Sequence, residues 1–295
     1  MLKIDGVNKS FGKVKALAEI DAMWGNGVHG LLGENGAGKT TLLRIIATIM
    51  EPDSGNLSFD GTLWTDKIKA RYMLGYLPQR FSMYRQIKVR EALEHIGILK
   101  GVNENLAQEV DRVLEAVNLK DKCEKKVGTL SGGMVRRLGI AQALIGKPKI
   151  VLLDEPTAGL DPEERILFRT MIRELGKQCI VLLSTHIVED VELTCDTVMI
   201  LHKGRVITSG EIDYVRDAAK GRVWELCFLN DSDKSINHSW IVTQKKKEDG
   251  IEKIRILSEK SPCEEAICVA PSLEESYMWL IDEGERHEAF KTINL

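Results

Sequence analysis

The sequence lacks any apolar run that is long enough to cross a membrane. Its longest apolar stretches, such as Ile150–Leu153 and Ile180–Leu183, are far shorter than the roughly 20 residues of a bilayer-spanning helix. The first residues contain no apolar segment followed by a cleavage site, so we expect no secretory signal peptide. Any role at a membrane therefore requires a partner chain.

Cysteine is scarce and follows no ligand pattern. The chain has six cysteines: Cys123, Cys179, Cys195, Cys227, Cys263 and Cys268. They form no C-x-x-C pair, so neither a disulfide framework nor a zinc site is predicted. We expect free and mostly buried thiols in a reducing compartment.

An excess of positive charge is also missing. Lys and Arg number 41 and Asp and Glu 44, which gives a net charge of −3. Proteins that wrap nucleic acid need a basic face, so no nucleic-acid partner is expected. With 43% apolar and 29% charged residues, the 295-residue chain has an ordinary globular composition, and its length favours two domains.

Strand-like runs alternate with helical patterns over the first 217 residues. A helix is expected after Lys39, a second over Glu104–Val117, and a third over Pro162–Leu175. Asp161 is the expected N-cap of the third helix, and Gly176 its stop. The strand-like runs are Leu2–Val7, Val28–Leu32, Tyr72–Leu77, Ile150–Leu153, Ile180–Ser184 and Thr197–Leu201. Alternation of this kind predicts a parallel α/β sheet, and residues 80–146, which lack strand signals, predict a helical insertion.

Residues 218–295 differ in pattern and predict a small α+β domain. Ser272-Leu273-Glu274-Glu275 fits a capping box at the start of a terminal helix. The charged run Lys245–Asp249, followed by Gly250, is interpreted as a solvated hairpin turn. The expected strands are Val223–Phe228, Trp240–Gln244, Ile254–Leu257 and Ala266–Ala270.

The strongest motif is a glycine-rich loop between an expected strand and an expected helix. Gly33-Glu34-Asn35-Gly36-Ala37-Gly38-Lys39-Thr40 fits G-x-x-x-x-G-K-[ST]. Glycines let successive N–H groups point at phosphate oxygens, and the helix N-terminus adds its positive end. Lys39 would neutralise the β- and γ-phosphates, and the Thr40 hydroxyl would ligate Mg²⁺. A glycine-rich turn that happens to contain lysine is the alternative, but the strand–turn–helix context favours the phosphate site.

A second motif ends the apolar strand at residue 150. Asp154 and Glu155 follow it at the edge of the sheet where open α/β sheets bind ligands. Asp154 suits a Mg²⁺ role, usually through water, and Glu155 is placed to polarise an attacking water. A strand that simply ends in solvated acids is the alternative, and the neighbouring phosphate loop disfavours it.

Four further motifs lie along the chain, two before Asp154 and two after Glu155, and their order together indicates a family resemblance. They are Tyr76-Leu77-Pro78-Gln79, Leu130-Ser131-Gly132-Gly133-Met134, Ala158-Gly159-Leu160-Asp161 and Ser184-Thr185-His186. Over residues 1–217 the chain resembles the ATP-binding cassette of an ABC transporter, of the exporter type. The resemblance implies a P-loop NTPase cassette with a helical subdomain at about 80–146, followed by the C-terminal α+β domain at 218–295.

The resemblance also implies roles within one copy of the chain. Residues Gly33 to Thr41 would bind ATP, and Phe11 would stack on adenine, although a core aromatic is the alternative for that residue. Gln79 would reach Mg²⁺ and the attacking water. His186 would bond the γ-phosphate and work with Glu155 and Lys39 in catalysis.

Other residues would act on the nucleotide held by a second copy. Ser131, Gly132, Gly133 and Asp161 match the family positions that face the partner's ATP. A plain helix cap is the alternative for the Ser-Gly-Gly element. Met134 stands where the family usually has glutamine, which leaves the coupling role of that side chain open.

These assignments imply an ATPase that dimerises on ATP and drives separate integral-membrane permease subunits, docked near Gln79–Arg90. Such a subunit would be cytoplasmic and peripheral on the membrane. Ser209-Gly210-Glu211 and the segment Ala270–Glu275 resemble exporter cassettes. The alternatives are a soluble ABC ATPase that acts on ribosomes or nucleic acid, and a nucleotide switch that does not hydrolyse ATP. A single cassette and intact Lys39, Asp154, Glu155 and His186 argue against both.

Overall fold

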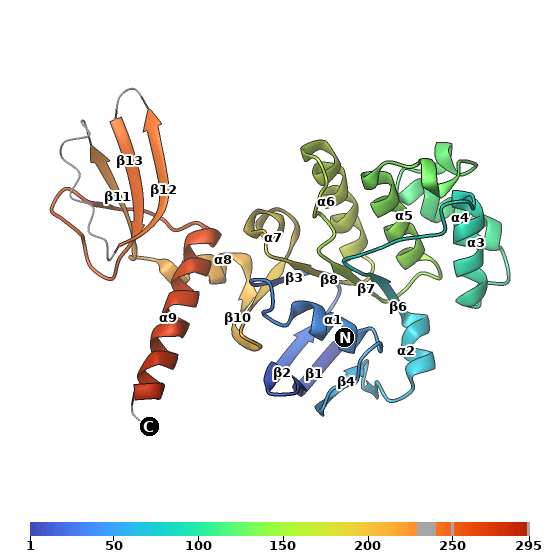
Figure 1. The fold of residues 1–295 in the computed structure, drawn as a ribbon, viewed down its shortest axis with the longest axis horizontal. Helices are drawn as coiled ribbons and strands as arrows, with labels where there is room; N and C mark the ends of the chain where they lie inside the picture. The colour runs from blue at the N-terminus through green and yellow to red at the C-terminus, as the bar shows by residue number, and fades with distance from the viewer. Residues whose placement is uncertain (229–239, 249–250, 294–295) are drawn as a thin grey trace. The chain divides into compact units, whose positions relative to one another are not determined.

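The computed structural model describes residues 1–228, 240–248 and 251–293. It divides into two compact units, Met1–Val206 and Ile207–Leu295. The sequence-based boundary at residue 217 lies 217 − 206 = 11 residues later. Among the described residues, the first unit contains two sheets and the second contains one (Figure 1).

A six-stranded sheet forms the centre of the first unit. Its order is β10-β9-β3-β8-β7-β6. The strands span Arg205–Glu211 (β10), Thr197–His202 (β9), Gly27–Leu32 (β3), Ile180–Thr185 (β8), Ile150–Asp154 (β7) and Leu74–Leu77 (β6). The pairs from β9 to β6 are parallel, and every residue of β3, β7 and β8 is buried. Burial on both faces explains why these strands show no apolar–polar alternation.

Helices cover both faces of this sheet, with α1 (Lys39–Ile46) and α6 (Pro162–Gly176) on opposite sides in Figure 1. Asp161 is the N-cap of α6 as predicted, and its carboxylate accepts from the backbone N–H of Glu164 at 2.8 Å. The helix ends at Gly176, which is its last residue, one residue later than the predicted end at Leu175. A Cβ at Gly176 would lie 2.6 Å from Cγ2 of Val28, so the glycine serves the close approach of α6 to β3.

The strand that we expected over Tyr72–Leu77 begins only at Leu74. Tyr72 and Met73 end helix α2 (Lys67–Met73) instead. Asp66 starts that helix, because its carboxylate accepts from the backbone N–H groups of Ile68 and Lys69 at 3.2 and 3.1 Å. The cap at Asp66 therefore favours a helix in a segment whose apolar pattern fits both a helix and a strand.

A second sheet in this unit was largely missed from the sequence. It is antiparallel, with the order β2-β1-β4-β5. The strands span Val14–Trp24 (β2), Leu2–Phe11 (β1), Ser54–Phe59 (β4) and Thr62–Leu63 (β5). The expected strand Leu2–Val7 corresponds to the first part of β1. The register between β1 and β2 shifts three times, and such irregularities obscure period-2 patterning.

The helical insertion is confirmed. Every residue from 78 to 149 is described, and none belongs to a strand. The helices are α3 (Val89–Leu99), α4 (Leu106–Ala116) and α5 (Gly132–Leu144), with short 3-10 turns at Lys120–Lys122 and Val127–Thr129. Helix α4 is slightly shorter than the range Glu104–Val117 that we expected.

The second unit is an α+β domain, as predicted. Its antiparallel sheet has the order β12-β13-β11-β14. Its elements are β11 (Val223–Phe228), β12 (Ile241–Glu248), β13 (Ile251–Leu257), β14 (Ile267–Cys268), α8 (Ile212–Arg216), the 3-10 turn Asp217–Ala219 and α9 (Leu273–Ile293), while helix α7 (Val188–Thr194) belongs to the first unit. The capping box forms: Ser272 N–H donates to Glu275 at 2.8 Å, and Glu275 N–H donates to Ser272 Oγ at 3.1 Å.

The prediction of a turn over Lys245–Asp249 was wrong for most of its length. Lys245, Lys246 and Lys247 are exposed residues of β12, an edge strand of this sheet. Asp249 and Gly250 lie outside the described residues. Lysines on an edge strand oppose pairing with another chain. The lysine run on β12 therefore opposes pairing of this sheet edge with a strand of another chain.

The cysteines are free thiols, but only Cys179 and Cys195 are buried. The expectation that most of them are buried was therefore wrong. Burial raises the pKa of Cys179 to about 11, which keeps that thiol protonated. As for membrane spans, none of the described helices combines the length and the apolar character needed to cross a bilayer.

Lys100 joins the helical insertion to the sheet. It follows α3, and its ammonium donates to the carbonyls of Ile145, Leu74 and Ala143 at 3.0, 3.2 and 3.4 Å. Two of these carbonyls lie at the C-terminal end of α5, where carbonyls have no helical partner. Lys100 thus fixes the far end of α5, which begins within the motif Leu130-Ser131-Gly132-Gly133-Met134 (the signature motif).

Replacing Lys100 with methionine keeps the apolar stem and removes this donor. We expect the free energy of unfolding to fall by about 1–3 kcal/mol at neutral pH, because buried carbonyls lose a charged donor. Burial lowers the pKa of Lys100 to about 8, below its unfolded value, so the folded chain releases a proton that the unfolded chain keeps. Stability contributed by Lys100 therefore rises with pH, and the deficit of Lys100→Met should widen by roughly 1 kcal/mol from pH 7 to pH 9.

Denaturant unfolding at both pH values measures this deficit, with the exposed Lys147→Met as the control. A deficit that stays constant or narrows as the pH rises would contradict the assignment.

Candidate functional site

The loop between β3 and α1 is built around glycines that no other residue can replace. A Cβ at Gly33 would lie 2.2 Å from the carbonyl oxygen of Leu201. Gly38 has φ = 109°, and its Cβ would lie 2.6 Å from the carbonyl oxygen of Ala16. The loop therefore curls against the sheet just before α1, where the motif predicts an anion-binding cradle of backbone N–H groups.

Lys39 is enclosed at the base of this loop. It is 5% exposed, and its ammonium donates to the carbonyls of Gly33 and Glu34 at 2.6 and 3.0 Å. Glu155 Oε1 lies 3.7 Å from the ammonium nitrogen. Burial lowers the pKa of Lys39, and the nearby charges of Glu155 and Asp154 oppose this effect. An anionic ligand in the cradle would likewise favour the charged form.

Asp154 is fully buried and only half satisfied. Its Oδ1 accepts from Ser184 Oγ at 2.6 Å and from Thr40 Oγ1 at 3.0 Å. Its Oδ2 is buried and has no hydrogen-bond partner among the residues that the structure describes. Leaving a buried carboxylate oxygen unpaired is costly, so this atom is suited to a cation.

The donor set fits Mg²⁺ bound together with phosphates. That ion uses one or two carboxylates plus substrate oxygens and seldom a full protein cage. Asp154 and Thr40 provide such a set at 3.0 Å from each other. Within the described part of the chain, no cluster of three or more His, Cys, Asp or Glu residues is arranged to hold a metal ion.

Glu155 follows directly, in a conformation that is rare for a residue with a side chain. Its φ is 48°, and its N–H donates to the carbonyl and to the hydroxyl of Ser184 at 3.1 and 3.2 Å. Glu155 Oε2 lies 2.9 Å from His186 Nδ1, while Oε1 is buried without a hydrogen-bond partner. The structure thus brings together Lys39, Glu155 and His186, which the sequence placed in one site.

Arg136 was missed by the sequence reasoning. From α5 its guanidinium donates to the carbonyls of Gln79, Asp154 and Pro156 at 2.9, 2.9 and 3.0 Å, and it also bonds the carbonyl of Glu155. One side chain of the signature helix therefore holds the loops after β6 and β7. No motif spacing signals this role, because the acceptors are backbone groups.

Asp190 is a second residue that the sequence reasoning missed. It is fully buried on α7, where it accepts from Thr157 Oγ1 at 2.5 Å and from Arg169 Nη2 at 2.7 Å. The hydrogen bond between Thr157 and Asp190 connects the loop that leads to Asp161 with α7, the helix that follows His186. A fully buried aspartate is uncommon and is retained here by its partners.

Two predicted ligand residues lie outside this cluster. Phe11 ends β1 and is 49% exposed, which excludes a core aromatic and leaves its ring face accessible. The ammonium of Lys9 lies 5.9 Å from the ring centroid. Gln79 is exposed, and among the described residues its side chain contacts neither Asp154 nor Glu155 through a hydrogen bond.

The signature element begins α5. Ser131 is exposed and caps the helix, with its hydroxyl accepting from Met134 N–H at 3.2 Å. Gly132 is exposed, whereas Gly133 is buried against the carboxylate of Glu164. Asp161 is exposed as well. In the described residues none of these side chains bonds to Lys39, Asp154 or Glu155, so the structure does not bring them to the cluster.

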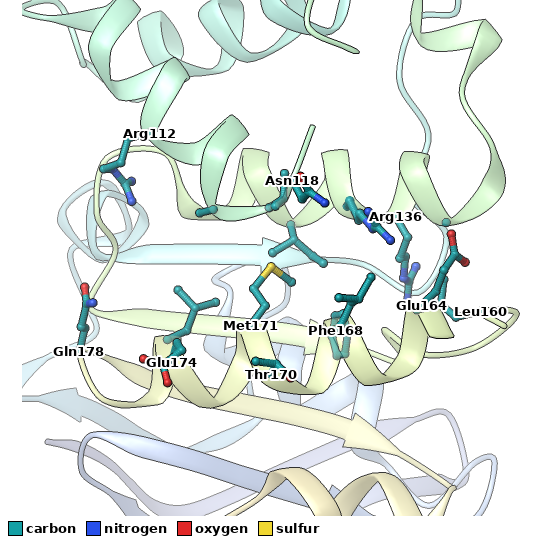
Figure 2. Close-up of a pocket in the computed structure, with 17 residues that line it drawn as sticks. Arg112, Asn118, Arg136, Leu160, Glu164, Phe168, Thr170, Met171, Glu174 and Gln178 are labelled. Carbon is teal, nitrogen blue, oxygen red and sulfur yellow. The ribbon is translucent and has the colours of Figure 1, made fainter. Parts of the chain in front are cut away.

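A cavity of about 430 Å³ separates α5 from α6 (Figure 2). Phe168 and Met171 of α6 and Ile140 of α5 line it. Arg136 and Glu164 lie near one end in Figure 2. The helical insertion is therefore loosely packed against α6 on this side, in contrast to the close contact of α6 with β3.

Comparison with known proteins identifies the family to which the chain belongs. The family described as "ABC transporter" matches residues 23–158. The chain is 38% identical over 228 residues to the uncharacterized ABC transporter ATP-binding protein YxlF of Bacillus subtilis (strain 168), covering 77% of this chain and 76% of that protein. It is 37% identical over 224 residues to the daunorubicin resistance ATP-binding protein DrrA3 of Streptomyces coeruleorubidus, covering 75% and 71%.

The fold agrees with solved structures. A structure described as the ATP binding subunit of an ABC transporter is 28% identical, with a TM-score of 0.66, and the match covers 73% of this chain and 92% of that one. The structure of cbiO1 from Clostridium perfringens, part of the ABC transporter complex cbiONQ, is 29% identical with a TM-score of 0.63, covering 71% and 88%. This chain belongs to the ATP-binding proteins of ABC transporters, a family of ATPases with the P-loop cassette fold.

Proposed function

We propose that two copies of this ATPase clamp ATP between them and that the cycle of clamping and hydrolysis drives export through separate membrane subunits. The arrangement of the motifs carries the proposal. One cluster contains Lys39, Thr40, Asp154, Glu155 and His186. Ser131 and Asp161 are exposed and do not belong to this cluster. A second copy that presents its signature helix N-terminus would complete the phosphate contacts.

Within one copy, the residues divide the chemistry. Lys39 neutralises phosphate charge, and Asp154 with Thr40 holds the cation. Mg²⁺ bound there would neutralise the charge that develops on the phosphate oxygens. Glu155 accepts a proton from water through Oε1, which accepts no hydrogen bond from the described residues, and His186 orients that carboxylate from 2.9 Å.

Phe11 and Gln79 complete the nucleotide site in this proposal. The accessible ring of Phe11 suits stacking on a base. Gln79 joins the phosphates once the helical insertion approaches, and the cavity between α5 and α6 leaves room for such a movement. Arg136 of α5 would couple the movement of the helical insertion to the position of Glu155, because it donates hydrogen bonds to the backbone carbonyls of Gln79 and Glu155.

The names of relatives favour export. One is a daunorubicin resistance protein, another a linearmycin resistance protein, and a third a Nod factor export protein, at 37%, 34% and 40% identity. We infer that this chain exports an organic compound from a position on the cytoplasmic face of the membrane. The permease would contact the region Gln79–Arg90, where Tyr84 is 81% exposed.

Glu155→Gln tests the clamp. The amide cannot accept the proton, so turnover should fall by about 10²–10⁴-fold while ATP still binds. Light scattering after size exclusion should then show dimers that need ATP and Mg²⁺. Lys39→Ala is the control and should stay monomeric. A Glu155→Gln chain that hydrolyses normally, or remains monomeric with bound ATP, would overturn the proposal.

Mixing two inactive variants tests whether the site is shared. Lys39→Ala lacks the phosphate contact and Ser131→Arg blocks the signature face, so each alone should be inactive. A mixed pair has one complete site. Equal amounts should therefore recover roughly a quarter of wild-type turnover, because half of the random pairs are mixed and each has one site of two. No recovery in a mixture that forms mixed dimers would show that each copy works alone.

Coexpression tests the membrane partner. A tagged chain should copurify with a chain of about six apolar spans encoded by a neighbouring reading frame, and the pair should hydrolyse ATP faster than the free subunit. Tyr84→Arg should weaken that association and leave the ATPase of the free subunit unchanged. Equal association of both variants would place the permease contact elsewhere.

A further inference from the structure

The strand pair that holds the catalytic carboxylates contains Ser184, a buried polar residue with no assigned role. β7 and β8 run parallel with Ile150, Val151, Leu152 and Leu153 opposite the apolar residues 180–183. At the last position of this register, Asp154 lies opposite Ser184. Ser184 is fully buried, and a buried hydroxyl is costly unless it is bonded.

The hydroxyl of Ser184 makes two bonds, one to each acidic residue. Its proton is donated to Asp154 Oδ1 at 2.6 Å, and its oxygen accepts the N–H of Glu155 at 3.2 Å. The carbonyl of Ser184 accepts the same N–H at 3.1 Å. One residue therefore contacts the side chain of the cation-holding acid and the backbone of the catalytic acid.

We propose that Ser184 is a positioning residue that turns the Asp154 carboxylate toward the divalent cation and holds Glu155 in place. The bonds from Ser184 and Thr40 both engage Oδ1, which leaves Oδ2 as the unpaired buried oxygen. Without the Ser184 bond, the carboxylate can rotate and exchange its two oxygens. The hydroxyl thus sets which oxygen meets the cation.

The same residue maintains the backbone of Glu155. A φ of 48° is unfavourable for a residue with a Cβ and persists only where the surroundings impose it. The two acceptors that Ser184 offers to the Glu155 N–H provide that constraint. The inference rests on the proposed nucleotide site but not on dimerisation, so it can be tested in single copies.

Ser184→Ala removes the hydroxyl and keeps the strand. With Mn²⁺ as the probe, electron paramagnetic resonance measures cation binding to the ATP-loaded chain, and a fluorescent ATP analogue measures nucleotide binding in EDTA. We expect Mn²⁺ to bind about tenfold more weakly or worse, as is typical when a residue that orients a metal ligand is lost. Nucleotide affinity in EDTA should change less than twofold, because the side-chain hydrogen bonds of Ser184 to the described residues reach Asp154 and Glu155 and not the phosphate loop.

Two further variants keep the test decisive. Ser184→Cys retains a weak donor of similar shape and should recover part of the Mn²⁺ affinity, also if Ser184→Ala folds poorly. Leu183→Val loosens the same strand without touching a carboxylate and should bind Mn²⁺ like the wild type. Equal losses in Leu183→Val and Ser184→Ala would overturn the proposal, because they would reflect strand packing.

Asp154→Asn separates this inference from the site assignment. If Asp154→Asn loses Mn²⁺ and Ser184→Ala binds it normally, the role of Ser184 is wrong and the cation site stands. If Asp154→Asn also binds Mn²⁺ normally, the cation site is misplaced and both fall.

Discussion

The parallel pairing of β7 with β8 is the constraint on which the site depends. Its register places Asp154 opposite Ser184. Glu155 follows Asp154 directly after β7, and His186 follows Ser184 by two residues, directly after β8. The preceding pairs of this register are all apolar and buried, so a slip by one residue would place Asp154 or Ser184 opposite an apolar residue. A buried polar group without a partner is costly, so the Asp154–Ser184 pair itself favours the observed register.

Local signals explain most of what the sequence predicted about the fold. The Asp161 cap, the capping box at Ser272 and the apolar strands β7 and β8 are decided by neighbouring residues, and the structure confirms them. The antiparallel strands β2 and β4 depend on long-range pairing and irregular register, which leave no simple period. The lysines of β12 carried the same ambiguity, since a charged run fits both a turn and an edge strand.

The residues of the site likewise fall into two groups, those that local sequence signals reveal and those that depend on contacts between distant segments. Motif spacing identified Lys39, Thr40, Asp154 and Glu155, and the family resemblance added His186. The structure brings these residues together. Spacing gave no indication of Arg136, because its partners are backbone carbonyls of two loops that lie far apart in the sequence. It also gave no role to Ser184, whose importance follows from the residue beside it on another strand.

The capping role of Ser131 does not compete with a role in binding phosphate. Its hydroxyl oxygen accepts from Met134 N–H and thereby fixes the first turn of α5, while the hydroxyl proton stays available for an outside acceptor. A fixed first turn holds the remaining free N–H groups in one direction, as an anion site requires. Met134 contributes its backbone to this arrangement, so the phosphate contact does not need the glutamine that the family usually has there.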